Sequence, residues 1–138
     1  MDHEVIPVTP IRVILADDNR TVLAEIATSL GKGFEIVGMA EDGEETIRVV
    51  ERSDPNVLVL DISMPLLNGL QVASRLQRSG CRTKIVFLTV HEQQSYISAA
   101  FACGGSAYVT KRHLASDLAA AIRAVVDGQT FLSPSLRE

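Results

Sequence analysis

The stretch Asn56–Gly69, NVLVLDISMPLLNG, decides the fold of this chain. It opens with a run that is apolar almost throughout, Asn56–Leu60, and changes abruptly to a polar loop at Asp61. A strand that does not alternate between apolar and polar residues is typical of the centre of a parallel sheet with helices on both faces. The stretch therefore predicts a buried parallel strand that ends at an aspartate.

The rest of the chain repeats this pattern, because short β-branched runs alternate with amphipathic stretches. Together they predict an α/β fold with a doubly wound, five-stranded parallel sheet and five helices, joined by right-handed crossovers. The predicted strands are Ile11–Ala16, Glu35–Met39, Asn56–Leu60, Lys84–Leu88 and Ala107–Thr110. The predicted helices are Thr21–Leu30, Glu44–Arg52, Gly69–Gln77, Gln94–Ala102 and Ala115–Val126.

The length of 138 residues and the 46% hydrophobic content fit one globular domain. Residues 1–10 contain two prolines and no periodicity, which predicts a flexible lead-in. The domain is expected to span residues 11–128. Gly128 then breaks the last helix, and the polar, proline-containing residues 129–138 are typical of the start of a linker.

Charge and hydropathy exclude several classes of function. The net charge of −4 comes with scattered basic residues, so we expect no direct contact with nucleic acid. The apolar runs are far shorter than the roughly 20 residues that cross a bilayer. The acidic N-terminus is also unlike a signal peptide. Together these features predict a cytoplasmic protein without a membrane contact. Cys81 and Cys103 form no metal-binding or redox motif, so we interpret them as reduced.

Polar residues follow four of the predicted strands. Asp17 and Asp18 come after the first strand, Asp61 after the third, Thr89 after the fourth and Lys111 after the fifth. Carboxyl ends of parallel strands meet at one edge, where ligands bind. Crowded carboxylates repel one another unless a cation lies among them, and oxygen ligands suit Mg²⁺. The sequence thus predicts a magnesium site where an aspartate could accept a phosphoryl group.

Each of these residues alone has an ordinary structural interpretation. Asp18 or Asn19 could cap the following helix, Thr89 could be a simple strand residue, and Lys111 could be a solvated charge. Their joint placement at the ends of different strands favours function.

The pattern resembles the receiver domains of bacterial two-component response regulators over roughly Ile11 to Gly128. This resemblance implies the flavodoxin-like order of strands. It rests on Asp17-Asp18 after the first strand, Asp61-Ile62-Ser63-Met64-Pro65 with Asn68-Gly69 after the third, Leu88-Thr89 ending the fourth, and Tyr108 three positions before Lys111.

The resemblance implies a role for each matching residue at the acidic edge. Asp61 is similar to the phosphoacceptor of the family. Asp18, Asp61 and the Ser63 carbonyl are similar to its direct Mg²⁺ ligands, and Asp17 to a ligand that acts through water.

The resemblance also implies how the domain would work. Lys111 is similar to the phosphate-binding cation. Thr89 and Tyr108 are similar to a switch pair, in which Thr89 would turn toward the phosphoryl oxygens and Tyr108 would fill the space that it vacates. The domain would be a signalling module and no conventional enzyme, although it would take up phosphoryl groups from donors and lose them by itself. A sensor histidine kinase would be the donor, and phosphorylation could favour a homodimer.

The tail after the last helix and the TKRH run at Thr110–His113 resemble the NarL/FixJ (LuxR-like) subfamily. This resemblance implies a longer transcription regulator whose helix-turn-helix output domain follows Glu138. The receiver would then control that output domain.

Three positions depart from the family pattern or need separate interpretation. Arg112 stands where the family often has a proline after a cis bond, and a cis bond before arginine would cost about 3–4 kcal/mol, so we expect a trans bond. Val90 is bulkier than usual and could slow phosphotransfer. His91 either tunes hydrolysis or is a solvated loop residue, and the sequence leaves both open.

Other classes fit less well. A haloacid dehalogenase-type hydrolase would carry a second aspartate two positions after the nucleophile, where this chain has Ser63. A nucleotide-binding Rossmann, P-loop or flavodoxin-like domain needs a glycine-rich or hydroxyl-rich turn after its first strand, where Asp17 and Asp18 lie instead. A degenerate receiver that only forms protein contacts would not need the acidic residues, Thr89 and Lys111.

Overall fold

The computed structural model describes residues 9–137, so most of the predicted lead-in lies outside the described residues. The strands are β1 (Ile11–Ala16), β2 (Phe34–Ala40), β3 (Val57–Leu60), β4 (Lys84–Thr89), β5 (Ala107–Thr110) and β6 (Phe131–Leu132). The helices are α1 (Arg20–Leu30), α2 (Gly43–Ser53), α3 (Gly69–Arg78), α4 (Gln94–Ala102) and α5 (Leu114–Val126). Two short 3₁₀ turns cover Lys111–His113 and Pro134–Leu136.

The sheet has six strands, so the prediction of five is wrong by one. The added strand is β6, whose Phe131 and Leu132 pair in parallel with Ala107 and Tyr108 of β5. A strand of two residues is too short to show a periodic pattern, and its partner strand lies far away in the sequence. The predicted start of the linker therefore contains an edge strand of the sheet.

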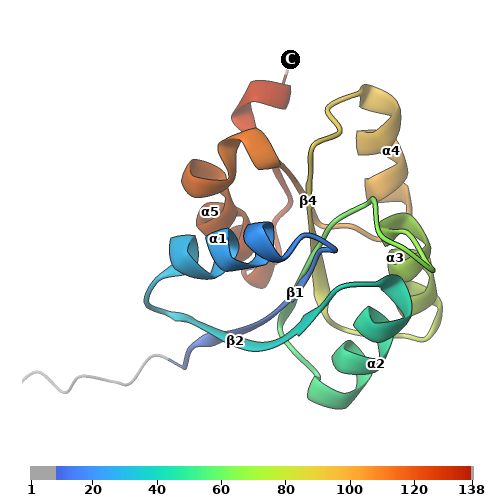
Figure 1. The fold of residues 1–138 in the computed structure, drawn as a ribbon. Helices are drawn as coiled ribbons and strands as arrows, with labels where there is room; N and C mark the ends of the chain where they lie inside the picture. The colour runs from blue at the N-terminus through green and yellow to red at the C-terminus, as the bar shows by residue number, and fades with distance from the viewer. Residues whose placement is uncertain (1–8, 138) are drawn as a thin grey trace, which may run out of the picture.

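All strand pairs are parallel, in the order β2-β1-β3-β4-β5-β6. Helices α1 and α5 lie on one side of the sheet, and α2, α3 and α4 lie on the other (Figure 1). The chain winds outward from β1 in one direction to β2 and in the other to β3, which is the doubly wound arrangement expected from the sequence. The change of direction lies between β1 and β3.

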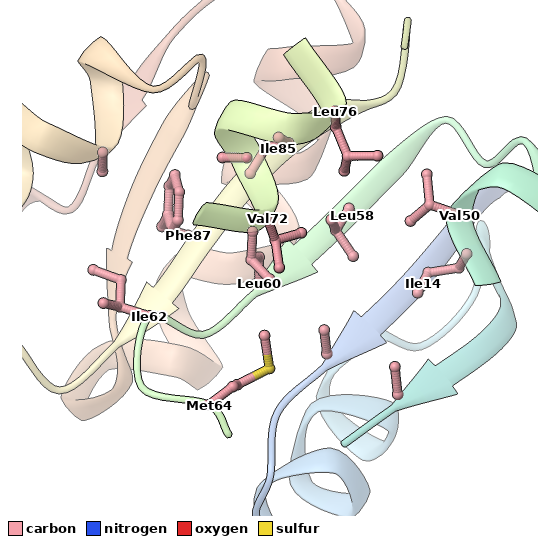
Figure 2. Packing of buried hydrophobic residues seen from close by; sticks show 14 of the residues in the cluster. Ile14, Val50, Leu58, Leu60, Ile62, Met64, Val72, Leu76, Ile85 and Phe87 are labelled. Carbon is pink, nitrogen blue, oxygen red and sulfur yellow. The ribbon is translucent and has the colours of Figure 1, made fainter. Parts of the chain in front are cut away.

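Two apolar layers hold the helices to the sheet. Figure 2 shows the layer under α2, α3 and α4, where Leu58 and Phe87 of the sheet face Val72 and Leu76 of α3. These four side chains are at most 2% exposed. Burying one side chain of this size contributes about 1.5–3 kcal/mol, so the central strands are firmly fixed and the loops at their ends start from rigid positions.

Side-chain caps decide where two helices begin beside the strand ends. Asn19 caps α1, because its side chain accepts hydrogen bonds from the backbone N–H groups of Thr21 and Val22. Asn68 and Gln71 form a reciprocal capping box at α3. Since Asn19 makes the cap, the neighbouring Asp18 carboxylate is not used for it.

Among the helices that the structure describes, none combines the length and the apolar character needed to cross a bilayer.

Candidate functional site

The predicted side chains meet at the carboxyl edge of the sheet, next to the point where the strand order changes direction. Asp17 directly follows β1 and Asp61 directly follows β3, and the two strand ends are tied together because the N–H of Asp61 donates to the carbonyl of Ala16 at 3.0 Å. Thr89 is the last residue of β4, and Lys111 follows β5. The parallel sheet thus brings together residues that are up to 94 positions apart, from Asp17 to Lys111.

Asp17, Asp18 and Asp61 form a compact acidic group. One carboxylate oxygen of each lies within 4.8 Å of the others. Asp17 and Asp61 are buried at 1% and 5% exposure, whereas Asp18 is exposed. The group therefore has two fixed carboxylates at its base and one at its solvent-facing side.

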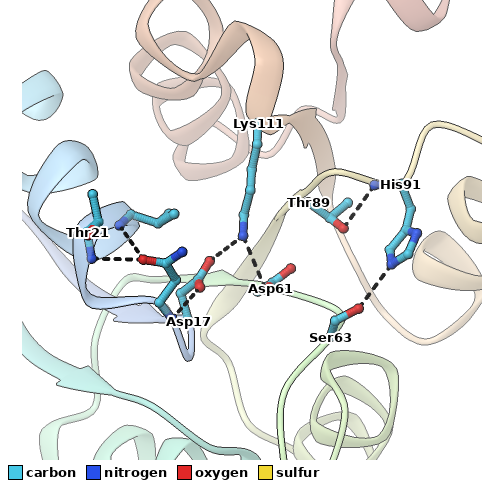
Figure 3. A network of polar contacts seen from close by, with 9 residues as sticks. Asp17, Thr21, Asp61, Ser63, Thr89, His91 and Lys111 are labelled. Carbon is cyan, nitrogen blue, oxygen red and sulfur yellow. Dashed lines mark hydrogen bonds and ion pairs between the residues drawn. The ribbon is translucent and has the colours of Figure 1, made fainter.

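Lys111 is the cation that partly neutralises this group. Its Nζ lies 2.7 Å from Oδ2 of Asp17 and 3.2 Å from Oδ2 of Asp61 (Figure 3). Burial alone would lower the pKa of Lys111, but its contacts with the two carboxylates outweigh burial and raise the pKa. Lys111 is therefore charged at any physiological pH.

The pKa of Asp61 is raised above its ordinary value, first by burial and then by the nearby charge of Asp17, although Lys111 acts in the opposite direction. One ammonium group does not compensate fully for the crowded carboxylates. Oδ2 of Asp17 is itself buried, and the Lys111 ammonium, 2.7 Å away, is shared between this oxygen and Asp61. A further cation would suit this group.

A second polar cluster lies beside the acidic group. Thr89 is fully buried, and its Oγ1 accepts a hydrogen bond from the N–H of His91 at 3.3 Å. The ring of His91 contacts Oγ of Ser63 through Nε2 at 3.0 Å and stacks on Tyr96 with 4.1 Å between the ring centroids. His91 is thus partly covered, which the interpretation as a solvated loop residue did not predict.

Tyr108 is already buried in this structure, with no exposed surface. Its hydroxyl donates to the carbonyl oxygen of His91 at 2.8 Å. The sequence led us to expect that this ring fills space only after Thr89 has turned. In the structure the ring needs no inward movement, because the His91 carbonyl and the neighbouring Phe87 already hold it.

The turn that carries Lys111 differs from the proline-containing turn common in the family. No cis peptide bond occurs within residues 9–137, so the predicted trans bond before Arg112 is confirmed. Arg112 pairs with Glu92 through two hydrogen bonds of 2.9 and 3.1 Å. The hydrogen bonds from Arg112 and, as the smaller effect, from the hydroxyl of Thr110 lower the pKa of Glu92 to about 2.

Sequence reasoning missed three polar residues around this turn, which are Glu92, Asp117 and Ser133. Ser133 is fully buried and Asp117 nearly so. Their contacts join segments that are 16 to 23 positions apart, and none of the three belongs to a recognisable motif. No local pattern could have identified them.

The arrangement has a clear chemical capability. The acidic group offers hard oxygen ligands that suit a divalent cation, and the buried Asp61 carboxylate, in contact with a charged lysine, has the chemistry of a nucleophile for phosphoryl transfer. A doubly wound parallel sheet with these side chains at one edge defines the class of receiver domains.

Comparison with known proteins agrees with that class. The family described as response regulator receiver domain matches residues 13–123, so the chain belongs to this family. More narrowly, it is a receiver of the NarL/FixJ (LuxR-like) type.

Two curated relatives illustrate the likeness. The chain is 34% identical over 128 residues to YvfU of Bacillus subtilis (strain 168), an uncharacterized transcriptional regulatory protein, covering 91% of this chain and 64% of that protein. It is 31% identical over 130 residues to the response regulator UvrY of Escherichia coli (strain K12), covering 93% and 60%. The chain thus spans less than two thirds of the length of these relatives.

Solved structures show the same fold. A LuxR-family two-component response regulator from Aurantimonas sp. SI85-9A1 superposes with a TM-score of 0.87 at 26% identity, covering 92% of both chains. The isolated REC domain of RcsB from Salmonella enterica serovar Typhimurium superposes with a TM-score of 0.84 at 29% identity, covering 92% of this chain and 96% of that one.

Proposed function

We propose that this receiver domain takes a phosphoryl group from a sensor histidine kinase onto Asp61 and thereby switches a transcriptional output domain. In this step a carboxylate oxygen of Asp61 forms a bond to phosphorus, the bond from phosphorus to the donor histidine nitrogen breaks, and the imidazole leaves. The contact of Lys111 Nζ with Asp61 at 3.2 Å, inside the acidic group, is the observation that carries the proposal. A small phosphodonor could replace the kinase, and water could later remove the phosphoryl group.

The residues fit a magnesium ion. Asp18, Asp61 and the Ser63 carbonyl would hold it directly, and Asp17 through a water molecule. The three clustered carboxylates, two of which are buried and share a single ammonium, support this assignment. When bound, Mg²⁺ neutralises charge on the phosphoryl oxygens. Lys111, in contact with Asp61, would add a second positive charge, and the Thr89 hydroxyl would turn to donate to a phosphoryl oxygen.

Thr89 and Tyr108 would pass the event to the surface. Both touch His91, Thr89 at its N–H and Tyr108 at its carbonyl. A turn of Thr89 toward the phosphoryl group would release the His91 N–H and change the loop between β4 and α4. The proposed readout is the face built from α4, β5 and α5.

The receiver would occupy residues 11–128 in a cytoplasmic transcription regulator, with residues 1–10 as a lead-in and residues 129–138 leading to a helix-turn-helix domain. The regulator names of the longer relatives support this. Phosphorylation would favour a homodimer. If the complete protein binds a promoter fragment no better after phosphorylation, this part of the proposal is wrong.

Intact-mass measurement tests the phosphoacceptor. Incubated with acetyl phosphate and Mg²⁺, the parent should gain one phosphoryl group, and Asp61→Asn should gain none. Asp127→Asn, an exposed aspartate away from the acidic group, is the matched control and should behave as the parent. Loss of modification in excess chelator would support the metal. Equal modification of Asp61→Asn would refute the assignment, and phosphate release without an adduct would favour a hydrolase.

A further inference from the structure

Ser133 is the one fully buried polar side chain that follows α5 in the described part of the chain. Its hydroxyl donates to Oδ2 of Asp117 at 2.8 Å and accepts a hydrogen bond from the N–H of Thr110 at 3.2 Å. Its own N–H donates to the carbonyl oxygen of Tyr108 at 3.0 Å. Three contacts therefore fix Ser133 between α5 and β5.

The sheet explains why Thr110 needs this partner. Carbonyl groups of Ser106 and Tyr108 accept bonds from Phe131 and Ser133, so alternate residues of β5 face β6. The N–H of Thr110 is the next donor on that side, but β6 has already ended. The hydroxyl of Ser133 takes the place of the missing strand. Without it a buried backbone donor would lose its partner, which proteins rarely tolerate.

Lys111 lies between two residues that are both held from outside the acidic group. Thr110 before it is held by Ser133 and also donates from its hydroxyl to Oε2 of Glu92 at 2.7 Å. Arg112 after it binds both carboxylate oxygens of the same glutamate. Glu92 thus binds both neighbours of Lys111 in the chain.

The position of this turn determines where the ammonium of Lys111 lies. A lysine side chain has four flexible carbons, and this one must keep Nζ near both Asp17 and Asp61. A displacement of about 1 Å in a reacting group can slow a reaction by as much as about a hundredfold. Where many relatives have a proline to stiffen the turn, this chain has Arg112 and the contacts described above.

We infer that Ser133 and Glu92 are positioning residues for Lys111, so that the segment after α5 is part of the phosphoryl-transfer site. This inference rests on the proposed function of Asp61. It adds two residues to the proposed site: Ser133, which directly follows β6, and Glu92, which lies in the loop between β4 and α4. Neither residue touches the phosphoryl group. They act by holding the backbone of Thr110 and Arg112.

The experiment follows phosphorylation by acetyl phosphate over time with intact mass, at several donor concentrations, on the whole chain. Ser133→Ala and Glu92→Ala should each lower the maximal rate about tenfold, while the dissociation constant for Mg²⁺ stays unchanged. Glu92 is on the surface, so its variant tests the inference even if Ser133→Ala does not fold. Ser135→Ala removes only an exposed contact with His113 and serves as the control with the parental rate.

A double-mutant comparison separates positioning from general loss of structure. In a Lys111→Met background the cation is already absent, so Ser133→Ala and Glu92→Ala should cause no further loss of rate. A mere stability effect would slow both backgrounds by the same factor. That result, or single variants as fast as the parent, would overturn the inference.

Failure of the proposed function gives a different result. If the parent gains no phosphoryl group on Asp61, the proposed function is wrong and this inference falls with it. If the parent is phosphorylated and Asp61→Asn is not, but the two positioning variants match the parent, then only this inference is wrong.

Discussion

Gly69 lies beneath Asp61 and has almost no space around its Cα. A Cβ atom at this position would collide with the backbone carbonyl oxygen of Asp61. The N–H of Gly69 also donates to the carbonyl of Ile62 at 2.7 Å, which keeps the two segments close. The close approach of the Asp61 carbonyl is therefore the physical reason why this position needs a residue without a Cβ.

We expect Gly69→Ala to lower the free energy of unfolding by about 1–3 kcal/mol, because a backbone carbonyl cannot rotate away. Chemical denaturation measures this. Gly38→Ala is the matched control, since its Cβ would meet a side-chain methyl of Val49 at 2.7 Å that can adjust. A larger loss for Gly38→Ala than for Gly69→Ala would show that the strain at Asp61 has been misjudged.

The Asp61 carboxylate itself should destabilise the metal-free protein at neutral pH. Its folded-state pKa is raised above the ordinary 3.8, mainly by burial. The folded state therefore binds more protons between these two values, so stability falls as the pH rises through that window. The buried charge of Asp61 therefore lowers the stability of the metal-free protein at neutral pH.

We expect Asp61→Asn to raise the free energy of unfolding in chelator at pH 7, because the neutral amide does not carry the burial cost of the carboxylate. The difference between variant and parent should shrink as the pH falls and disappear below 3.8, where the parent carboxyl is protonated in both the folded and the unfolded state. Thermal or urea unfolding across this pH range measures it. Glu51→Gln, an exposed carboxylate, should show no such gain, and a less stable Asp61→Asn would contradict the argument.

At the scale of elements, the sequence predicted those whose signal is local. Strand β1 and helix α4 have their predicted bounds, and β5 does as well. The residues at the acidic edge could be found because each ends or directly follows a strand, and a parallel sheet brings strand ends together. They are Asp17, Asp61, Thr89 and Lys111. β6 and the contacts of Ser133 could not be found, since a two-residue strand has no period and its partners lie far away in the sequence.

Removal of residues 129–138 should therefore destabilise the domain, although the chain up to Gly128 contains every predicted strand and helix. Truncation would leave the N–H of Thr110 and the Asp117 carboxylate without the Ser133 hydroxyl. An orphaned buried polar group costs about 1–3 kcal/mol, so we expect a loss of at least this size in urea unfolding.

Truncation after residue 133 provides the comparison for this prediction, because it keeps β6 and Ser133. That shorter chain should retain most of the stability of the parent. If ending the chain at residue 128 costs nothing relative to ending it at 133, then the tail is a plain linker and β6 contributes little.

At the scale of the whole molecule, His91 connects the acidic edge with the surface helices. Its N–H is bound to Thr89, its carbonyl to Tyr108 and its ring to Ser63 and Tyr96. Tyr96 belongs to α4. Because Tyr108 is already buried, we expect signalling to shift this loop without a large movement of the ring. A signal would then depend on one hydrogen bond, that of the Thr89 hydroxyl.

We therefore expect Thr89→Val to accept a phosphoryl group and yet lose most of the response of α4, β5 and α5. Valine keeps the shape of threonine. It has no hydroxyl that could release the N–H of His91 and form a hydrogen bond to a phosphoryl oxygen instead. Backbone amide spectra before and after phosphorylation measure the response, and the coupling free energy at stake is typically about 1–3 kcal/mol.

Thr46→Val is the control for that experiment, because Thr46 is also fully buried but lies in α2 and bonds only to the carbonyl of Asp42. It should respond as the parent does. The comparison decides between two mechanisms, since a hydroxyl-driven switch requires that only Thr89→Val lose the shift. If phosphorylated Thr89→Val moves the same amides as the parent, the charge on Asp61 acts through Lys111 and the turn after β5 instead, and the route through His91 is wrong.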